Sequence, residues 1–156
     1  MERGKVKKIL MFYRDIDGEL KYNAKIIRDY EDEYYTAGGG SALDGVPKSK
    51  HKISRPAEVA ALNTPAFVSM RIRELETANE QLGKLKGAIM QELDKLPLVQ
   101  KNILYDFYIK GMQWVQIAFA VNYSERQCRN ICYRGLDNLA EYFSRNALVR
   151  SFNYPF

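Results

Sequence analysis

The sequence predicts an all-α protein: a long N-terminal helical hairpin or coiled coil, followed by a C-terminal helix-turn-helix domain. Two series of apolar residues recur at steps of three and four, which is the spacing of one face of an α-helix. A third segment, residues 114–131, carries the residue types that two short helices joined by a tight turn require. The chain has 156 residues and 46% hydrophobic content, so it is long enough to bury a core.

The first predicted element is a helix over residues 1–36, one face of which is apolar. Such a face must pack against another helix, as in a coiled coil. Gly18 follows Asp17 and costs a helix interior about 1 kcal/mol or marks a turn, so a helix broken at this point is the alternative. The residues of the apolar face are Val6, Ile9, Tyr13, Ile16, Leu20, Ala24, Ile27, Tyr30 and Tyr34.

Residues 37–63 form a linker that is rich in glycine and in cations, and its first part is expected to be flexible. Its glycine run is not a phosphate-binding loop, because no strand precedes it and no Gly-Lys-Ser or Gly-Lys-Thr follows it. The linker also holds the densest basic run of the chain. Such runs are usually just solvated, but the alternative is an arm that contacts the backbone or minor groove of DNA. The cations of this run are Lys48, Lys50, Lys52 and Arg55, with His51 among them.

The second long helix is predicted over residues 64–95. Thr64 is a suitable N-cap, and Pro65 suits the first helical position, where a missing amide hydrogen costs nothing. The apolar spacing of the first helix is repeated with two polar interruptions, Asn79 and Lys86. The series is Val68, Ile72, Leu75, Asn79, Leu82, Lys86, Ile89, Leu93 and Leu96.

The two apolar faces are expected to pair, either within one chain as an antiparallel hairpin or between chains. A polar residue such as Asn79 on an apolar face costs stability but can fix the register of pairing. The alternative is an Asn tolerated at the edge of the surface. A homodimer is the preferred oligomer, because proteins that bind duplex DNA often gain affinity and spacing specificity from two-fold symmetry. The expected oligomerisation residues are Ile16, Leu20, Ile27, Ile72, Leu75, Asn79, Leu82 and Ile89.

Residues 96–143 carry the helix-turn-helix pattern. Ala118 is small where the two short helices approach, and Asn122 stands where the turn needs a left-handed residue. Ser124 can then cap the second helix by accepting a bond from an amide of its first turn. Apolar contacts that hold the crossing angle are expected from Ile117, Val121, Tyr123, Cys128 and Ile131.

The outer face of the second short helix carries side chains suited to a DNA groove. Arg can donate two bonds to guanine, Gln or Asn can pair with adenine, Glu can accept from cytosine, and Ser or Tyr can hold phosphates. The alternative is an ordinary solvated helix face. The expected DNA-binding residues are Ser124, Glu125, Arg126, Gln127, Arg129, Asn130, Tyr133 and Arg134.

The flanks of this motif resemble region 4 of the sigma-70 family. Residues 96–111 match its Leu-Pro helix start and its Leu-x-x-x-Tyr-x-x-Gly approach, and residues 133–139 match its small-Leu-x-x-Leu ending. The arrangement of the whole chain is similar to that of phage transcriptional regulators of the ArpU and RinA type, with a helical N-terminal half. This resemblance implies an activator of late or packaging genes that binds double-stranded DNA through the second helix of the motif. The promoter-opening region of a true sigma factor is not recognised in the N-terminal half.

Two other functions compete with a sequence-specific regulator. One is a sigma-like adaptor, in which residues 96–143 contact RNA polymerase while recognising a promoter element. The other is a DNA-packaging protein like a small terminase subunit, which also combines a helix-turn-helix with oligomerising helices but is expected to form a ring. The net charge of +5, concentrated in the linker and the C-terminal domain, assists phosphate binding in all three.

Catalysis, cofactors and metals find no support in the sequence, so the chain is not expected to be an enzyme. Its single His51 lacks a His-Glu-x-x-His context, and no nucleophile stands near a candidate base. Cys128 and Cys132 lie one helical turn apart, but zinc would need two more ligands. They are expected to be reduced thiols in the cytoplasm, since neither a signal peptide nor a membrane-spanning segment is recognised. The aromatic tail, residues 144–156, is expected to pack on its own domain, with docking on a partner such as RNA polymerase as the alternative.

Overall fold

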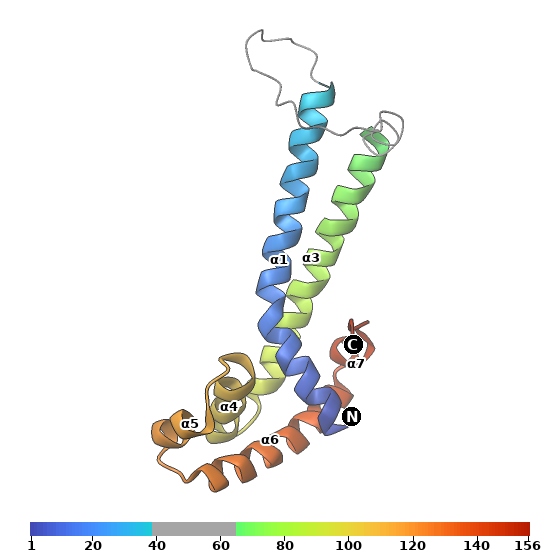
Figure 1. Cartoon of the computed structure of the whole chain (residues 1–156). Coiled ribbons are helices and arrows are strands. Elements are labelled where there is room, and N and C mark those ends of the chain that lie inside the picture. The colour runs from blue at the N-terminus through green and yellow to red at the C-terminus, as the bar shows by residue number, and fades with distance from the viewer. Residues whose placement is uncertain (39–64) are drawn as a thin grey trace. The chain divides into compact units, whose positions relative to one another are not determined.

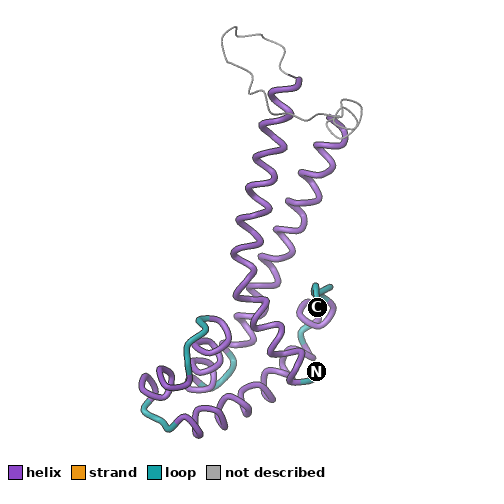
Figure 2. Tube along the Cα trace, in the orientation of Figure 1, coloured by secondary structure: helices purple, strands orange, loops and turns teal. Residues whose placement is uncertain are grey.

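The computed structural model describes residues 1–38 and 65–156, with side chains for 1–33 and 65–156. Every regular element in this part of the chain is helical (Figures 1 and 2), so the all-α prediction is confirmed for it. The described helices are α1 (Arg3–Gly38), α3 (Pro65–Asp94), α4 (Leu98–Leu104), the π-helix η1 (Tyr105–Ile109), α5 (Trp114–Val121), α6 (Glu125–Arg145) and α7 (Ala147–Ser151).

The chain forms two compact units, and their boundary runs through both long helices. The first unit consists of Met1–Glu19 and Gln81–Phe156, and the second of Leu20–Glu80. Each of α1 and α3 therefore contributes to both units. The segments predicted from the sequence follow the ends of the helices, so they divide the chain differently from these units.

The N-terminal half of α1 is part of the core of the first unit. Val6, Ile9 and Ile16 are fully buried there, as their spacing predicts, and so is Leu10, which the predicted apolar face omits. The helix continues without a break through Gly18, so the alternative of a broken helix is wrong. A methyl group at Gly18 would meet nothing within 4 Å, and the helix passes this point with no contact that needs a glycine.

In the second unit, hydrogen bonds of two asparagine side chains link α1 to α3. The side-chain amide of Asn23 donates to Oδ1 of Asn79 at 2.9 Å, and the amide of Asn79 donates to the carbonyl of Leu20 at 3.4 Å. The two long helices therefore pair within one chain and run in opposite directions (Figure 1). Pro65 is the first residue of α3, whereas Thr64, the expected cap, lies outside the described residues.

Within the first unit, α4 approaches α6 closely. Gly135 allows it, because a Cβ at this position would lie 3.0 Å from Cδ1 of Leu104 and 3.3 Å from Cβ of Gln100. A second glycine, Gly111, lies shortly after η1 and has φ +70, a backbone conformation that residues with a side chain rarely adopt. The fully buried side chains around these helices are Ile103, Leu104, Ile117, Cys128, Leu136, Leu139 and Phe143.

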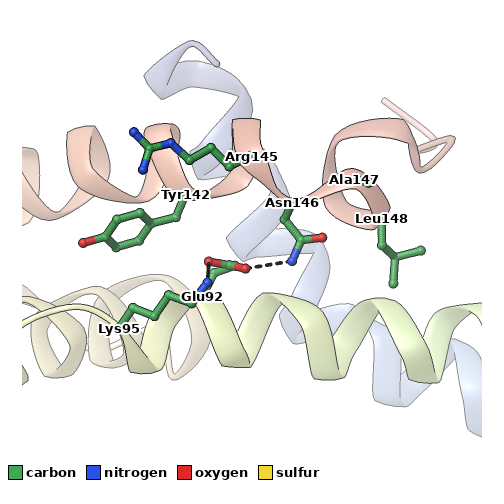
Figure 3. Close-up of a pocket in the computed structure, with 7 residues that line it drawn as sticks. All are labelled: Glu92, Lys95, Tyr142, Arg145, Asn146, Ala147 and Leu148. Carbon is green, nitrogen blue, oxygen red and sulfur yellow. Dashed lines mark hydrogen bonds and ion pairs between the residues drawn. The ribbon is translucent and has the colours of Figure 1, made fainter.

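The C-terminal tail packs on α1 within the first unit, as expected. The ring of Phe12 lies 5.8 Å from that of Tyr154 in an edge-on geometry and 6.4 Å from that of Phe156. Asn146 starts α7 by accepting the amide of Val149, and its own amide donates to the buried carboxylate of Glu92 at 2.8 Å (Figure 3). Burial alone would raise the pKa of Glu92, but the hydrogen bonds from Asn146 and Lys95 lower it.

Candidate nucleic-acid interface

The turn between α5 and α6 has the local geometry that the sequence predicts. Asn122 has φ 57 and ψ 36, the left-handed conformation, and is the only residue other than glycine with positive φ in the described part of the chain. Ser124 accepts the amide of Gln127 at 3.1 Å and caps α6. This hydrogen bond fixes the start of α6 in a rigid turn rather than a frayed end.

Gln127 contributes to the same cap, which the sequence analysis missed. Its Oε1 accepts the backbone amide of Ser124 at 3.0 Å, so the two residues form a reciprocal capping box. Both were predicted to contact DNA directly. Their hydrogen-bonding oxygens hold the helix start, while the hydroxyl hydrogen of Ser124 and the side-chain amide hydrogens of Gln127 are not used by the cap, so the expected DNA contacts stay a prediction. The spacing Ser-x-x-Gln was the signal available in the sequence.

Arg129 is held by two contacts on the surface of the first unit. Its guanidinium lies 3.3 Å from a carboxylate oxygen of Glu125, one turn earlier, and 5.6 Å from the ring centroid of Trp114. Trp114 in turn stacks on Phe107, with ring centroids 4.2 Å apart. A guanidinium over an aromatic ring is attracted to the electron-rich face. Arg129 and Glu125 are therefore pre-positioned, and either side chain would have to break their ion pair to contact a base.

Arg126, Asn130 and Arg134 differ from Arg129 because they are exposed and make no ion pair or side-chain hydrogen bond with any described residue. They are four residues apart and so form one row along α6. Asn130 and Arg134 also line a shallow hollow with Tyr123 and Gln127. This row presents two guanidinium groups and one amide to solvent.

Tyr123 and Ile131 lie differently from the prediction, which placed both in the packing between α5 and α6. Tyr123 is 41% exposed and lines the hollow beside the row, while Ile131 is only half-buried. Tyr123, the residue after the left-handed Asn122, therefore adds an aromatic side chain to the exposed side of the motif.

Tyr133 of α6 contacts two cations near the N-terminus of the chain. Arg3 and Lys7 each lie 5.7 Å from the centroid of its ring, and Arg3 also forms an ion pair with Asp137 on the next turn. These two cations are not among the DNA-binding residues expected from the sequence. The basic character of residues 3–8 was the only signal, and its proximity to α6 depends on tertiary packing.

Both cysteines are buried inside the first unit, as the sequence analysis expects for Cys128. Burial raises the pKa of the Cys128 thiol, and it raises the pKa of the Cys132 thiol to about 11. Both groups therefore keep their protons near neutral pH and are poor metal ligands or nucleophiles. Among the residues that the structure describes, no three His, Cys, Asp or Glu side chains are grouped to hold a metal ion.

The expected oligomerisation residues fall into two groups. Ile16, Leu82 and Ile89 are buried within a single chain, so the expectation that they contact a second chain is wrong. These side chains already fill the core between α1 and α3. Leu20, Ile27, Ile72 and Leu75 are half-buried, as is Asn79, which bonds to Asn23 of the same chain. The expected backbone contacts Lys48, Lys50, Lys52 and Arg55 lie outside the described residues.

No described helix is both long and apolar enough to cross a membrane. Comparison of the chain with family models, with curated proteins and with solved structures finds no match.

Proposed function

We propose that this protein is a sequence-specific DNA-binding regulator of transcription, in which the first half of α6 enters the major groove. The observation that carries this proposal is the row of Arg126, Asn130 and Arg134, exposed and without a bound side-chain partner among the described residues. The resemblance of residues 96–143 to region 4 of the sigma-70 family supports the same function. It favours a phage regulator that activates late or packaging genes.

The chemistry of the row fits direct recognition of bases. Arginine donates two hydrogen bonds to guanine, and asparagine pairs with both hydrogen-bonding positions of adenine in the major groove. At 1.5 Å per helical residue, Arg126 and Arg134 are about 12 Å apart along the axis. This distance corresponds to three or four base pairs at about 3.4 Å each. One α6 would thus recognise a short half-site.

The other expected DNA-binding residues near the row have roles that their contacts indicate. Ser124 and Gln127 hold the start of α6, while Glu125 and Trp114 hold Arg129. Rigid support of this kind reduces the conformational entropy that binding would otherwise cost. Arg129 is suited to a phosphate contact beside the groove, since it lies next to the row and already points along a defined direction.

A second candidate function is a sigma-like adaptor that contacts RNA polymerase. Two apolar side chains on successive turns of α5 favour it: Val115 is 64% exposed and Phe119 is 89% exposed. Exposed apolar side chains that gather on one helix face are typical of a surface that another protein binds. In this function DNA binding would depend on polymerase.

The experiment that tests the proposal is selection of bound duplexes from a random DNA library at near-physiological salt. The wild type is compared with the Arg126→Ala, Arg134→Ala double variant. The control is Arg150→Ala combined with Arg145→Ala, which removes the same charge from exposed residues at and after the end of α6. The wild type and the control are expected to enrich one motif, and the row variant is expected to lose it.

Each outcome separates the candidates. A bidentate contact favours the correct base over another by about 1–3 kcal/mol at one base pair. A variant that lacks one arginine should therefore lose its preference for a particular base at one position of the site only. An equal loss on all sequences would instead make both arginines phosphate contacts. Enrichment that appears only after RNA polymerase is added would favour the adaptor. No enrichment under either condition would contradict both functions and favour a packaging role.

A further inference from the structure

A second line of side chains runs along α6 beside the row of Arg126, Asn130 and Arg134. Its residues stand three positions after the members of the row and are spaced by four from one another, so the two lines are neighbours on the helix surface. We refer to this second line as the flank. It consists of Arg129, Tyr133 and Asp137.

The later part of the flank holds two cations that come from α1. The guanidinium carbon of Arg3 and Nζ of Lys7 each lie 5.7 Å from the ring centroid of Tyr133. Arg3 also donates two hydrogen bonds to the carboxylate of Asp137, from Nε and from Nη2. Arg3 and Lys7 are four residues apart and so share one side of α1, which begins beside α6 (Figure 1). The fold of the first unit therefore adds a distant segment of the sequence to the flank.

The carboxylates near these cations are already compensated. The three carboxylates of α6 are each paired with an arginine, in the pairs Glu125 with Arg129, Asp137 with Arg3, and Glu141 with Arg145. Within residues 1–14 the one acidic residue is Glu2, and no ion pair joins it to Arg3 or Lys7. Lys7 itself forms no ion pair with any residue that the structure describes. Like Arg126 and Arg134, it is a cation without a carboxylate partner.

The other two lysines at the start of α1 lie away from α6. Nζ of Lys5 is 5.8 Å from the ring centroid of Tyr154, and Nζ of Lys8 is 5.5 Å from that of Phe156. Both rings belong to the C-terminal tail. The basic run of residues 3–8 is thus divided between two sides of α1, and only Arg3 and Lys7 reach the flank.

The width of the major groove relates the flank to a DNA strand. The groove is about 12 Å wide, and an α-helix with its side chains is about 10–12 Å thick. A helix that turns the row toward the base edges therefore turns its flanks toward the sugar-phosphate strands that border the groove. Cations on a flank then face phosphates, as Arg129 is expected to do in its first turn.

We propose that Lys7, with Arg3 beside it, binds a phosphate of the DNA strand that borders the row, and that the ring of Tyr133 positions Lys7 for this contact. The inference rests on the function proposed above and adds α1 to the interface. A phosphate contact carries no sequence information directly, but it fixes how α6 lies in the groove. It also changes the role expected of Tyr133, since its ring rather than its hydroxyl serves the contact.

The test is the salt dependence of binding to two duplexes, one with the motif that the wild type enriches and one of random sequence. Each phosphate contact contributes about 0.9 to the slope of log K against log salt concentration. Lys7→Gln is therefore expected to lower this slope by about 1 on both duplexes. Between about 50 and about 200 mM salt, its affinity should fall about threefold less than that of the wild type.

The matched control is Lys8→Gln, which removes the same charge from the neighbouring residue on another side of α1. It is expected to keep the wild-type slope. Tyr133→Phe keeps the ring that lies beside Lys7 and removes only the hydroxyl, so it should keep this slope as well. Circular dichroism checks that all three variants are folded.

An unchanged slope for Lys7→Gln would overturn the inference, and so would an equal decrease for Lys8→Gln. If Tyr133→Phe lowers the slope as much as Lys7→Gln does, the hydroxyl binds the phosphate and the positioning role of the ring is wrong. If Lys7→Gln weakens binding to RNA polymerase and leaves the DNA slope unchanged, the cations meet an acidic protein surface and the inference falls.

The random duplex separates this inference from the proposed function. Equal affinity of the wild type for both duplexes, with a lower slope for Lys7→Gln, would contradict sequence-specific recognition and support the phosphate contact. A preference for the motif with an unchanged slope would support the function and overturn the inference. No binding to either duplex would overturn both.

Discussion

Replacing Gly135 by alanine tests the packing that holds α6 in place. A Cβ at this position would lie 3.0 Å from Cδ1 of Leu104 and 3.3 Å from Cβ of Gln100. Leu104 is fully buried, and Gln100 accepts a hydrogen bond from Asn138, so neither can withdraw freely. Overpacking of this kind costs about 2 kcal/mol.

Alanine also has a helix propensity that is better than that of glycine by about 1 kcal/mol. We therefore expect Gly135→Ala to lower the free energy of unfolding by about 1 kcal/mol. The control is Gly87→Ala in α3 of the same unit, where a Cβ would meet nothing within 4 Å. There the propensity acts alone, and the free energy of unfolding should rise by about 1 kcal/mol.

Urea unfolding followed by circular dichroism measures both variants. The informative quantity is the difference between them, about 2 kcal/mol with opposite signs. If Gly135→Ala stabilises the protein as much as Gly87→Ala does, the close approach of α4 to α6 is not as tight as the geometry indicates.

Two further predictions concern buried polar groups. Asn79→Leu leaves the buried amide of Asn23 without its partner and should lower the free energy of unfolding by about 1–3 kcal/mol. Adding Asn23→Leu removes the unpaired amide and should recover most of this loss. A single variant as stable as the wild type would contradict the pairing of the two asparagines. Burial raises the pKa of the Cys132 thiol from 9.0 to about 11, so the unfolded state loses this proton first as the pH rises. The stability that depends on the neutral thiol is thus complete below pH 9.0 and is lost between pH 9.0 and about pH 11. Denaturant unfolding over this pH range should show a smaller fall in the free energy of unfolding for Cys132→Ala than for the wild type.

Local signals in the sequence predicted much of the fold. Pro65 at the start of α3, the left-handed Asn122 and the Ser124 cap each depend on residues within a few positions, so their conformations follow from local chemistry. Helical spacing likewise predicted that Val6, Ile9 and Ile16 are buried. The π-helix of Tyr105–Ile109 has no comparable signal, and the pattern there indicated only a helix.

The candidate site was less predictable because the contacts of its side chains depend on which residues the fold brings near them. Helical spacing placed Arg126, Arg129 and Arg134 on the outer face of α6 without distinguishing them. Arg129 differs because Trp114 and Glu125 lie within its reach. Asn23 was missed for a related reason: a search for apolar residues passes over an asparagine whose burial depends on Asn79 in a distant segment.

The stack of Phe107, Trp114 and Arg129 has a practical consequence. Trp114 is the single tryptophan of the chain, so the intrinsic fluorescence excited at the red edge of protein absorption comes from this one indole. A guanidinium close to the ring changes the local electric field that the excited state senses, and Arg129 lies next to the row of Arg126. Any ligand that draws Arg129 away from the indole would therefore change the emission spectrum, and the molecule carries its own unlabelled optical reporter of events at α6.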